Sequence, residues 1–316
     1  MKATESRDST QKILIMGSKN AGKTCIQATL FADFSAFDTK SIPFTNSIIE
    51  NKVQFLGHNL RINDCGGQKD LIQHYLKNIS SELFRSVGFL IYVFDIMSQD
   101  REEELRTYEQ ITQKLVENSP TARLFILLHK IDLIPVQSQD ATIADRRRQI
   151  ELKSSKGVVA GIFATSIFNS SLYSAWSQII KDIIPDLTLC DRTLSSVAKT
   201  MLCDEIVLVE KLTFLVLGSY SAEKRTDNDA RYFKLSRMIK SFKIECSKNG
   251  KEITSVVIRN PGFSVVMHGF TPNTYVFLMF YGRECKPALV MKNLEFAGRI
   301  FQNNKDSELK NLQHIW

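Results

Sequence analysis

The sequence lacks the features that place a protein across a membrane or anchor it there. No apolar run approaches the ~18 residues that a membrane-spanning helix needs, and the polar start, MKATESRDST, lacks the apolar core of a signal peptide. Lys2 stands where N-myristoylation requires glycine, and the last residues, LQHIW, contain no prenylation box. We therefore expect a cytoplasmic protein with no transmembrane segment or lipid anchor, which reaches a membrane only through partners.

Paired cysteines and a concentrated basic patch are also missing. The six cysteines are scattered without a Cys-x-x-Cys pair, which is typical of reduced thiols in the cytosol. The net charge of +7 is spread along the chain, and the densest basic run is Arg146-Arg147-Arg148. This run lies in a polar segment that we expect to be a solvated helix face, so the charge predicts no nucleic-acid partner.

Short apolar runs alternate with amphipathic segments up to residue 187. The runs are KILIMG, VQFLG, LRIND, GFLIYVFD, RLFILLHK and GIFATS, and helical stretches such as 100–118 and 171–184 separate them. This alternation predicts an α/β fold, with a six-stranded, mostly parallel sheet covered by helices on both faces. The runs at 53–56 and 60–64 are too close for a crossover helix, so we expect one hairpin and one antiparallel strand.

The pattern changes after Pro185 to helix, hairpin, helix, three-strand meander and helix, which predicts an α+β domain with an antiparallel sheet. Its elements are a helix near 190–203, the strands EIVLVE and TFLVLGSY, a basic helix near 226–246, strands around 253–282, and a helix near 284–303. We therefore expect a flexible N-terminus at 1–11, a first domain at 12–187, a second at 188–304 and a tail at 305–316.

Residues 17–24, GSKNAGKT, separate the first apolar run from the helical pattern CIQATLFADF. This is the pattern of a P-loop: backbone N–H groups wrap the β-phosphate and the following helix directs its positive end at it. Lys23 reaches the β and γ oxygens, and the Thr24 hydroxyl binds magnesium. We expect the phosphates to be bound by Lys19, Asn20, Ala21, Gly22, Lys23, Thr24 and Cys25.

Residues 64–68, DCGGQ, end the third apolar run. In a P-loop protein, Asp64 can hold magnesium through water, Gly67 can present its N–H to the γ-phosphate, and Gln68 can orient the attacking water. Taken alone, the pentapeptide is only a turn with two glycines. Its distance from the P-loop and its position after a strand favour the functional interpretation.

Thr45 lies in the loop between the first helix and the second strand. There its hydroxyl can bind magnesium and its N–H the γ-phosphate, so that GTP orders the loop and hydrolysis releases it. Thr39 lies in the same loop and can reach the nucleotide in one state, although either residue could be an ordinary loop threonine. The predicted metal ligands are Thr24, Thr45 and Asp64, and the predicted catalytic residues are Gln68, Thr45 and Lys23.

Residues 129–132, HKID, follow the apolar run RLFILL. The carboxylate of Asp132 can accept hydrogen bonds from N1–H and the 2-amino group of guanine, whereas adenine offers no such pair of donors. The motif therefore favours GTP and GDP, with Mg2+, over ATP. We expect the base to be contacted also by His129, Lys130, Ser166 and Ile167.

Together these segments resemble the Rag small GTPases, and the Rag A/B type more closely than the C/D type. The resemblance rests on HKID, with His in place of the usual Asn, on the doubled glycine of DCGGQ, and on FRSVGFLIYVFDI, ENSPTARLFILLHKIDL and TSIFNSSLYSAWSQIIKDIIP. It continues through CDEIVLVEKLTFLVLGSY, IKSFKIECSK and TPNTYVFLMF, and so covers nearly the whole chain.

This resemblance implies a Ras-like GTPase domain followed by a roadblock-type dimerisation domain. It also implies a heterodimer with a Rag C/D-type GTPase through the C-terminal domain, a membrane-tethering scaffold at the lysosome or vacuole, and a GTPase-activating protein. When this subunit holds GTP, the pair is expected to recruit the TOR kinase complex and so signal amino-acid sufficiency.

The chain departs from the family pattern around the phosphate site. Lys19 occupies the third P-loop position, where the family tends to have a small polar residue, and Phe44 and Asn46 flank Thr45 in place of small and β-branched residues. A side chain at position 19 lies close to where the γ-phosphate and Gln68 must meet. Crowding there predicts slow intrinsic hydrolysis, whereas an amine that stabilises transition-state charge predicts faster hydrolysis.

Two other functions remain open beside a GTP-hydrolysing switch. A nucleotide-bound scaffold with little or no GTP turnover is consistent with Lys19 and the altered loop, although Thr45 and Gln68 are intact. A P-loop kinase or metabolic ATPase explains only residues 17–24 and leaves HKID without a role.

Overall fold

The computed structural model describes residues 10–32, 34–154, 157–184, 190–223, 228–251, 253–282 and 285–303. Two compact units divide the chain, one of residues up to 54 with 58–175 and the other of residues 55–57 with those from 176 onward. The predicted boundary at 187/188 lies outside the described residues, as do the tail and most of the N-terminal segment. Those predicted limits therefore stay predictions.

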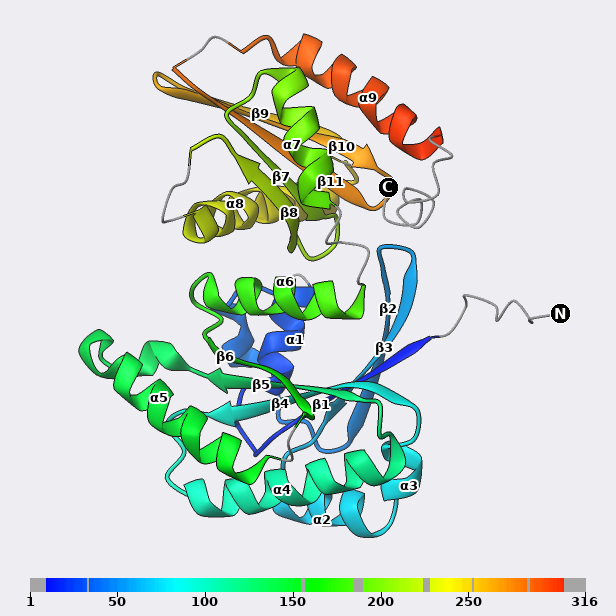
Figure 1. Ribbon diagram of the computed structural model, residues 1–316, viewed down its shortest axis with the longest axis vertical. Helices are drawn as coiled ribbons and strands as arrows, with labels where there is room; N and C mark the ends of the chain where they lie inside the picture. The colour runs from blue at the N-terminus through cyan, green and yellow to red at the C-terminus, as the bar shows by residue number, and fades with distance from the viewer. Residues whose placement is uncertain are drawn as a thin grey trace, which may run out of the picture. The chain divides into compact units, whose positions relative to one another are not determined.

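The first unit is built on a six-stranded sheet with the order β2-β3-β1-β4-β5-β6 (Figure 1). Every ladder from β3 to β6 is parallel, and β2 is joined to β3 by only two residues, Leu56 and Gly57, both with positive φ. A connection that short forces an antiparallel pair, as the sequence predicts. The strands are β1 (Gln11–Met16), β2 (Ile48–Phe55), β3 (His58–Cys65), β4 (Val87–Asp95), β5 (Arg123–His129) and β6 (Val159–Thr165).

Helices cover both faces of this sheet. The central strands β4 and β5 have apolar residues on both sides, and these residues are buried beneath the helices. Three helices, α2, α4 and α5, bury Tyr75, Tyr108 and Ile150 in one core with the strands, and Figure 1 shows α1 on the opposite face. The helices are α1 (Lys23–Phe31), α2 (Lys69–Lys77), α3 (Ser80–Leu83), α4 (Arg101–Asn118), α5 (Val136–Lys153) and α6 (Ser171–Ile183), which spans the limit between the units. The polar loops that follow β1, β3, β4, β5 and β6 therefore meet at one edge of the sheet.

The second unit is built on a five-stranded antiparallel sheet with the order β8-β7-β11-β10-β9. The helix α8 packs on one face through Tyr232 and Ile239, and α7 and α9 lie on the other (Figure 1). This is the predicted α+β plan. The elements are α7 (Cys190–Met201), β7 (Glu205–Glu210), β8 (Val216–Ser221), α8 (Asn228–Lys248), β9 (Ser255–Asn260), β10 (Phe263–Thr271), β11 (Thr274–Tyr281) and α9 (Pro287–Asn303).

No helix in the described part of the chain combines the length and the apolar character needed to cross a bilayer.

Candidate nucleotide-binding site

The P-loop joins the end of β1 to the first turn of α1. The Nζ atom of Lys23 donates hydrogen bonds to the carbonyl oxygens of Gly17 and Ser18, both at 2.9 Å, so the loop folds around its own lysine. Gly22 has a φ of +97°, and a Cβ atom there would lie 2.6 Å from Cδ2 of His129. Position 22 therefore requires glycine, both for its left-handed backbone and for the close approach of the loop after β5.

Lys23 is buried, and this burial lowers the pKa of its ammonium to about 8. The nearby carboxylate of Asp64 opposes that shift, while burial in turn raises the pKa of Asp64. A cation in a low-dielectric setting interacts more strongly with an anion than an exposed cation does. The position of Lys23 therefore suits a phosphate group.

Three side-chain oxygens from separate elements meet beside the P-loop. The hydroxyl of Thr24 donates to Oδ2 of Asp64 at 2.6 Å and lies 2.7 Å from Oγ1 of Thr45, and Thr45 is itself 3.5 Å from the same carboxylate oxygen. The other oxygen of Asp64, Oδ1, is buried and has no hydrogen-bond partner among the described residues. Mg2+ prefers such hard oxygen ligands, so these side chains fit that ion.

The segment 64–68 lies directly against the P-loop. A Cβ atom on Gly67 would lie 2.5 Å from the carbonyl oxygen of Gly17 and 2.6 Å from the backbone nitrogen of Lys19, so no larger residue fits between the two loops. Burial raises the pKa of the Cys65 thiol to about 12, which makes this cysteine an inert packing residue.

The side-chain amide of Gln68 is held by the loop that carries Thr45. Its Nε2 atom donates to the carbonyl oxygen of Thr45 at 3.0 Å and to Oδ1 of Asn46 at 2.9 Å. Its Oε1 atom is buried and makes no hydrogen bond within the described part of the chain. An amide anchored through its nitrogen keeps its oxygen as an acceptor, which is the atom that can orient a water molecule.

The residues predicted to contact the base follow β5. His129 is buried, its Nδ1 atom lies 2.9 Å from Oγ1 of Thr165, and burial lowers its pKa to about 4, so the imidazole is neutral at pH 7. Lys130 turns the chain with a φ of +68°, and Asp132 is exposed in the short helix η2 (Ile131–Leu133). The buried imidazole supports the P-loop at Gly22, while Asp132 keeps an accessible carboxylate.

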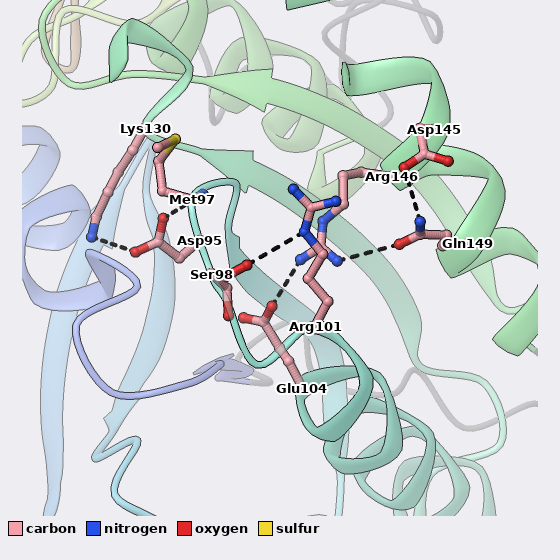
Figure 2. A network of polar contacts seen from close by, with 9 residues as sticks. All are labelled: Asp95, Met97, Ser98, Arg101, Glu104, Lys130, Asp145, Arg146 and Gln149. Carbon is pink, nitrogen blue, oxygen red and sulfur yellow. Dashed lines mark hydrogen bonds and ion pairs between the residues drawn. The ribbon is translucent and has the colours of Figure 1, made fainter. Parts of the chain in front are cut away.

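Asp95, the last residue of β4, was missed by sequence reasoning. Its Oδ2 atom lies 2.6 Å from Nζ of Lys130, and its Oδ1 atom accepts the N–H of Met97 at 2.9 Å (Figure 2). The carboxylate therefore holds the lysine of HKID from a neighbouring strand end. An acidic residue at the carboxyl end of the apolar run FLIYVFD was the signal that could have identified it.

Two predicted contact residues make hydrogen bonds within their own loops. The N–H of Ser166 donates to Oγ of Ser171 at 2.9 Å, and its hydroxyl oxygen accepts the N–H of Phe168 at 3.0 Å. Thr39, in the short helix η1 (Asp38–Ser41), is buried and donates to the carbonyl oxygen three residues earlier at 2.7 Å. Neither residue lines the cavity at the P-loop.

One cavity brings together most of the residues predicted to contact the phosphates. The fully buried Ala21 is not part of its lining, nor are Asp64, His129, Asp132 and Ile167. Ile42 and Pro43, which the sequence did not point to, contribute apolar side chains to this wall together with Phe44. The lining consists of Lys19, Asn20, Gly22, Lys23, Thr24, Cys25, Ile42, Pro43, Phe44, Thr45, Gly67, Gln68 and Lys130.

The prediction of a solvated basic run is wrong for Arg146. This residue is fully buried, and its Nη2 atom lies 2.9 Å from Oε2 of the equally buried Glu104 on α4 (Figure 2). Arg147 and Arg148 are exposed, as expected. Burial raises the pKa of Glu104 and the charge of Arg146 opposes this shift, so the pair is a buried structural contact between α4 and α5.

The fold and the site together define a class of protein. A mostly parallel sheet that carries a P-loop after β1, an Asp-x-Gly-Gly-Gln turn after β3 and a Lys-x-Asp loop after β5 is that of a Ras-like GTPase.

Comparison with known proteins leads to the same class. The family model described as "Gtr1/RagA G protein conserved region" matches residues 12–239. The chain is 35% identical to GTP-binding protein gtr1 of Schizosaccharomyces pombe, over 94% of this chain and 97% of that protein. It is 34% identical to Ras-related GTP-binding protein A of Dictyostelium discoideum, over 92% and 97%.

A more distant relative is Ras-related GTP-binding protein C of Homo sapiens, which is 29% identical over 59% of this chain and 47% of that protein. The chain therefore belongs to the Gtr1/RagA G protein family, and it is a GTP-binding GTPase of the Rag A/B type. The resemblance to the Rag A/B type is confirmed.

Proposed function

We propose that this GTPase is a magnesium-dependent switch in which the loop carrying Thr45 responds to the γ-phosphate. The observation that supports this most is the position of Thr45 between two other loops. Its hydroxyl is 2.7 Å from that of Thr24 in the P-loop, and its carbonyl oxygen accepts the amide of Gln68 at 3.0 Å. Release of this one residue would therefore loosen the metal ligands and the catalytic glutamine together.

This proposal gives each predicted site residue one role. Lys23 binds the β and γ oxygens, Gly67 donates its N–H to the γ-phosphate, and Oε1 of Gln68 orients the attacking water. Mg2+, held by Thr24 and Thr45 and through water by Asp64, would neutralise the charge on the phosphate oxygens. The remaining contacts are assigned to Lys19, Asn20, Ala21, Gly22, Cys25 and Thr39 for the phosphates and ribose, and to His129, Lys130, Asp132, Ser166 and Ile167 for the base.

The test is to extract the nucleotide from the purified chain, identify it, and follow single-turnover GTP hydrolysis with magnesium and an activating protein. We expect guanine nucleotide with slow intrinsic turnover. Gln68→Leu should keep the nucleotide but lower the stimulated rate by about 10²-fold or more, because the water is no longer oriented. Gln110→Leu, an exposed position on α4, is the matched control.

Three outcomes would change the proposal. Adenine nucleotide would contradict the role of Asp132, and unchanged turnover in Gln68→Leu would contradict the role of Gln68. Guanine nucleotide without any turnover, even with the activating protein, would instead favour a nucleotide-bound scaffold.

We further propose that the C-terminal unit pairs with a Rag C/D-type subunit. The strand β9 is at an edge of the five-stranded sheet, and an edge strand can accept another strand. On α8, Met238 and Phe242 are four residues apart and about half exposed, 52% and 55%, which gives the surface an apolar pair suited to burial by a partner. Similarity of the chain to a C-type protein supports a partner with a related fold.

Co-expression with a C/D-type subunit tests this pairing. Phe242→Glu should weaken co-purification by about 10-fold or more, because a charge replaces a buried aromatic anchor. Leu152→Glu, a 77% exposed position on α5 of the first unit, is the control and should have no effect. Intact pairing in Phe242→Glu would exclude this face of α8 as the contact.

Membership in the Gtr1/RagA family supports the wider role that the resemblance implies. The heterodimer would be tethered at the lysosome or vacuole by a scaffold, and would recruit the TOR kinase complex when this subunit holds GTP. Cells that carry Gln68→Leu should then keep TOR-dependent phosphorylation during amino-acid starvation. Loss of that phosphorylation at the wild-type rate would contradict this role.

A further inference from the structure

Two residues in which the chain departs from the family pattern contact each other. The Nζ atom of Lys19, in the P-loop, lies 5.0 Å from the centroid of the Phe44 ring, within the range of a cation–π interaction. Phe44 is 65% exposed, whereas most large apolar side chains of this unit are buried. The exposed ring therefore has a cationic partner in the P-loop.

The contact extends a series of anchors along three consecutive residues. Thr45 is bound to Thr24 and Gln68, and Asn46 accepts a hydrogen bond from the same Gln68 amide at 2.9 Å. Phe44 adds a contact to the P-loop at Lys19, five positions before Thr24. Residues 44–46 are thus attached to the P-loop at two positions, Lys19 and Thr24, as well as to Gln68 in the segment after β3.

Lys19 lies between two cavities, and Phe44 lines only one of them. The first is the cavity with Lys23 and Thr45, and the second contains the carboxylates Asp100, Glu103 and Glu104 together with Lys69. Glu103 is paired with Lys69 at 2.6 Å and Glu104 with Arg146 at 2.9 Å, so Asp100 is the carboxylate of this cavity that would attract the Lys19 ammonium most directly. The ring of Phe44 offers the ammonium a partner on the side of the phosphate-binding residues.

We propose that Lys19 and Phe44 form a clasp that closes residues 42–46 over the phosphate end of the nucleotide and keeps the Lys19 ammonium at that end. The clasp rests on the proposed function, because it acts on a guanine nucleotide in this site. A γ-phosphate adds negative charge near the ammonium, so the clasp slows release of GTP more than release of GDP. Lys19 and Phe44 are positioning residues and take no part in bond cleavage.

The test is a double-mutant cycle on nucleotide release from the full chain with magnesium. Fluorescent N-methylanthraniloyl GDP and a non-hydrolysable GTP analogue are displaced from wild type, Lys19→Met, Phe44→Leu and the double variant. Each single variant should release the GTP analogue about 2- to 5-fold faster, the range of an exposed cation–π contact. The double variant should be no faster than the faster single variant, and GDP release should change less.

A control cycle separates the contact from a general effect of charge. Lys40 is exposed in the same loop region. The effects of Lys40→Met and Phe44→Leu on the release rate should therefore be independent, and in the double variant they should multiply. Lys19→Arg keeps a cation that can pack on the ring, and should restore the wild-type rate.

The proposal is overturned if the effects of Lys19→Met and Phe44→Leu also multiply, or if Lys19→Arg behaves like Lys19→Met. Failure of the wild-type chain to bind either guanine nucleotide would instead contradict the proposed function itself. The two failures are therefore distinguishable in the same experiment.

Discussion

The two sheets of this molecule treat their polar side chains in opposite ways. In the first unit, parallel strands end at one edge, where Asp64 and Gln68 each hold a buried oxygen that makes no hydrogen bond within the described residues. In the second unit, the carboxylate of Glu210 accepts hydrogen bonds from the N–H groups of Leu212 and Thr213 and from the Thr213 hydroxyl, at 2.7 to 2.9 Å. The same kind of group is available for a ligand in one unit and closes a turn in the other.

This difference follows from the topology. Parallel strands all point the same way, so each crossover begins with a loop at the same edge, and these loops bring distant residues together. Antiparallel strands are joined by short turns whose polar groups satisfy each other locally, as Thr271 and Thr274 do at 2.6 Å between β10 and β11. Chemistry is therefore expected at the first sheet and pairing with a partner at the second.

The largest effect is expected from a substitution at the open edge of the first sheet, at Asp132, to which we assign selection of the base. Asp132→Asn replaces an acceptor of two hydrogen bonds with one acceptor and one donor, so the 2-amino group of guanine faces another donor. We expect affinity for GDP to fall by up to about 10⁴-fold, and affinity for xanthosine diphosphate to rise, since its 2-oxo group can accept from the new amide. Equilibrium titration with both nucleotides measures this, and unchanged GDP affinity would contradict the assignment.

A smaller effect is expected from two ion pairs, one in each unit, in which an arginine is paired with a buried carboxylate. The side chains of Arg146 and Glu104 are 0% and 2% exposed, whereas Arg231, the partner of Glu205, is 24% exposed. Arg146→Met should lower the free energy of unfolding by about 3–5 kcal/mol, because it leaves a carboxylate buried without its counter-charge. Arg231→Met should lower it by only about 1–2 kcal/mol, because Arg231 is partly solvated and the buried carboxylate of Glu205 keeps a hydrogen bond from the Tyr232 hydroxyl at 3.3 Å.

Chemical denaturation combined with hydrogen exchange assigns each loss to its unit. The double variant Glu104→Leu with Arg146→Met should be more stable than Arg146→Met alone, because no charge remains buried. Equal losses of unfolding free energy in Arg146→Met and Arg231→Met would show that the exposure of the arginine does not set the strength of these ion pairs.

Sequence reasoning was most successful where the signal is local. The P-loop, and a six-stranded sheet with one antiparallel strand, follow from spacing and from the length of the connections. Arg146 could not be placed, because DRRRQ has the pattern of a solvated helix and its partner Glu104 is 42 residues earlier in the chain. The contact of Asp95 with Lys130 was hidden for the same reason, since two separate strands must first align.

The last effect concerns pH and has opposite signs in the two units. His129 has a pKa of about 4 in the folded chain, against roughly 6.5 when unfolded. As the pH falls from about 6.5 to 4, the unfolded chain takes up a proton that the folded chain does not, so stability falls. Wild type should therefore lose roughly 3 kcal/mol relative to His129→Asn over this range, as measured by urea denaturation at each pH.

Glu210 should give the reverse slope, because burial raises its pKa above the ordinary value of 4.5. Between the unfolded and folded pKa values the folded chain binds the extra proton, so its contribution to stability is full at low pH and is lost as the pH rises. Relative to Glu210→Gln, wild type should therefore become more stable on acidification, whereas relative to His129→Asn it becomes less stable. If stability relative to the two variants changed with pH in the same direction, burial alone would not set the pKa values of His129 and Glu210. The open edge of the first sheet and the closed turn of the second would then respond to protons in the same way.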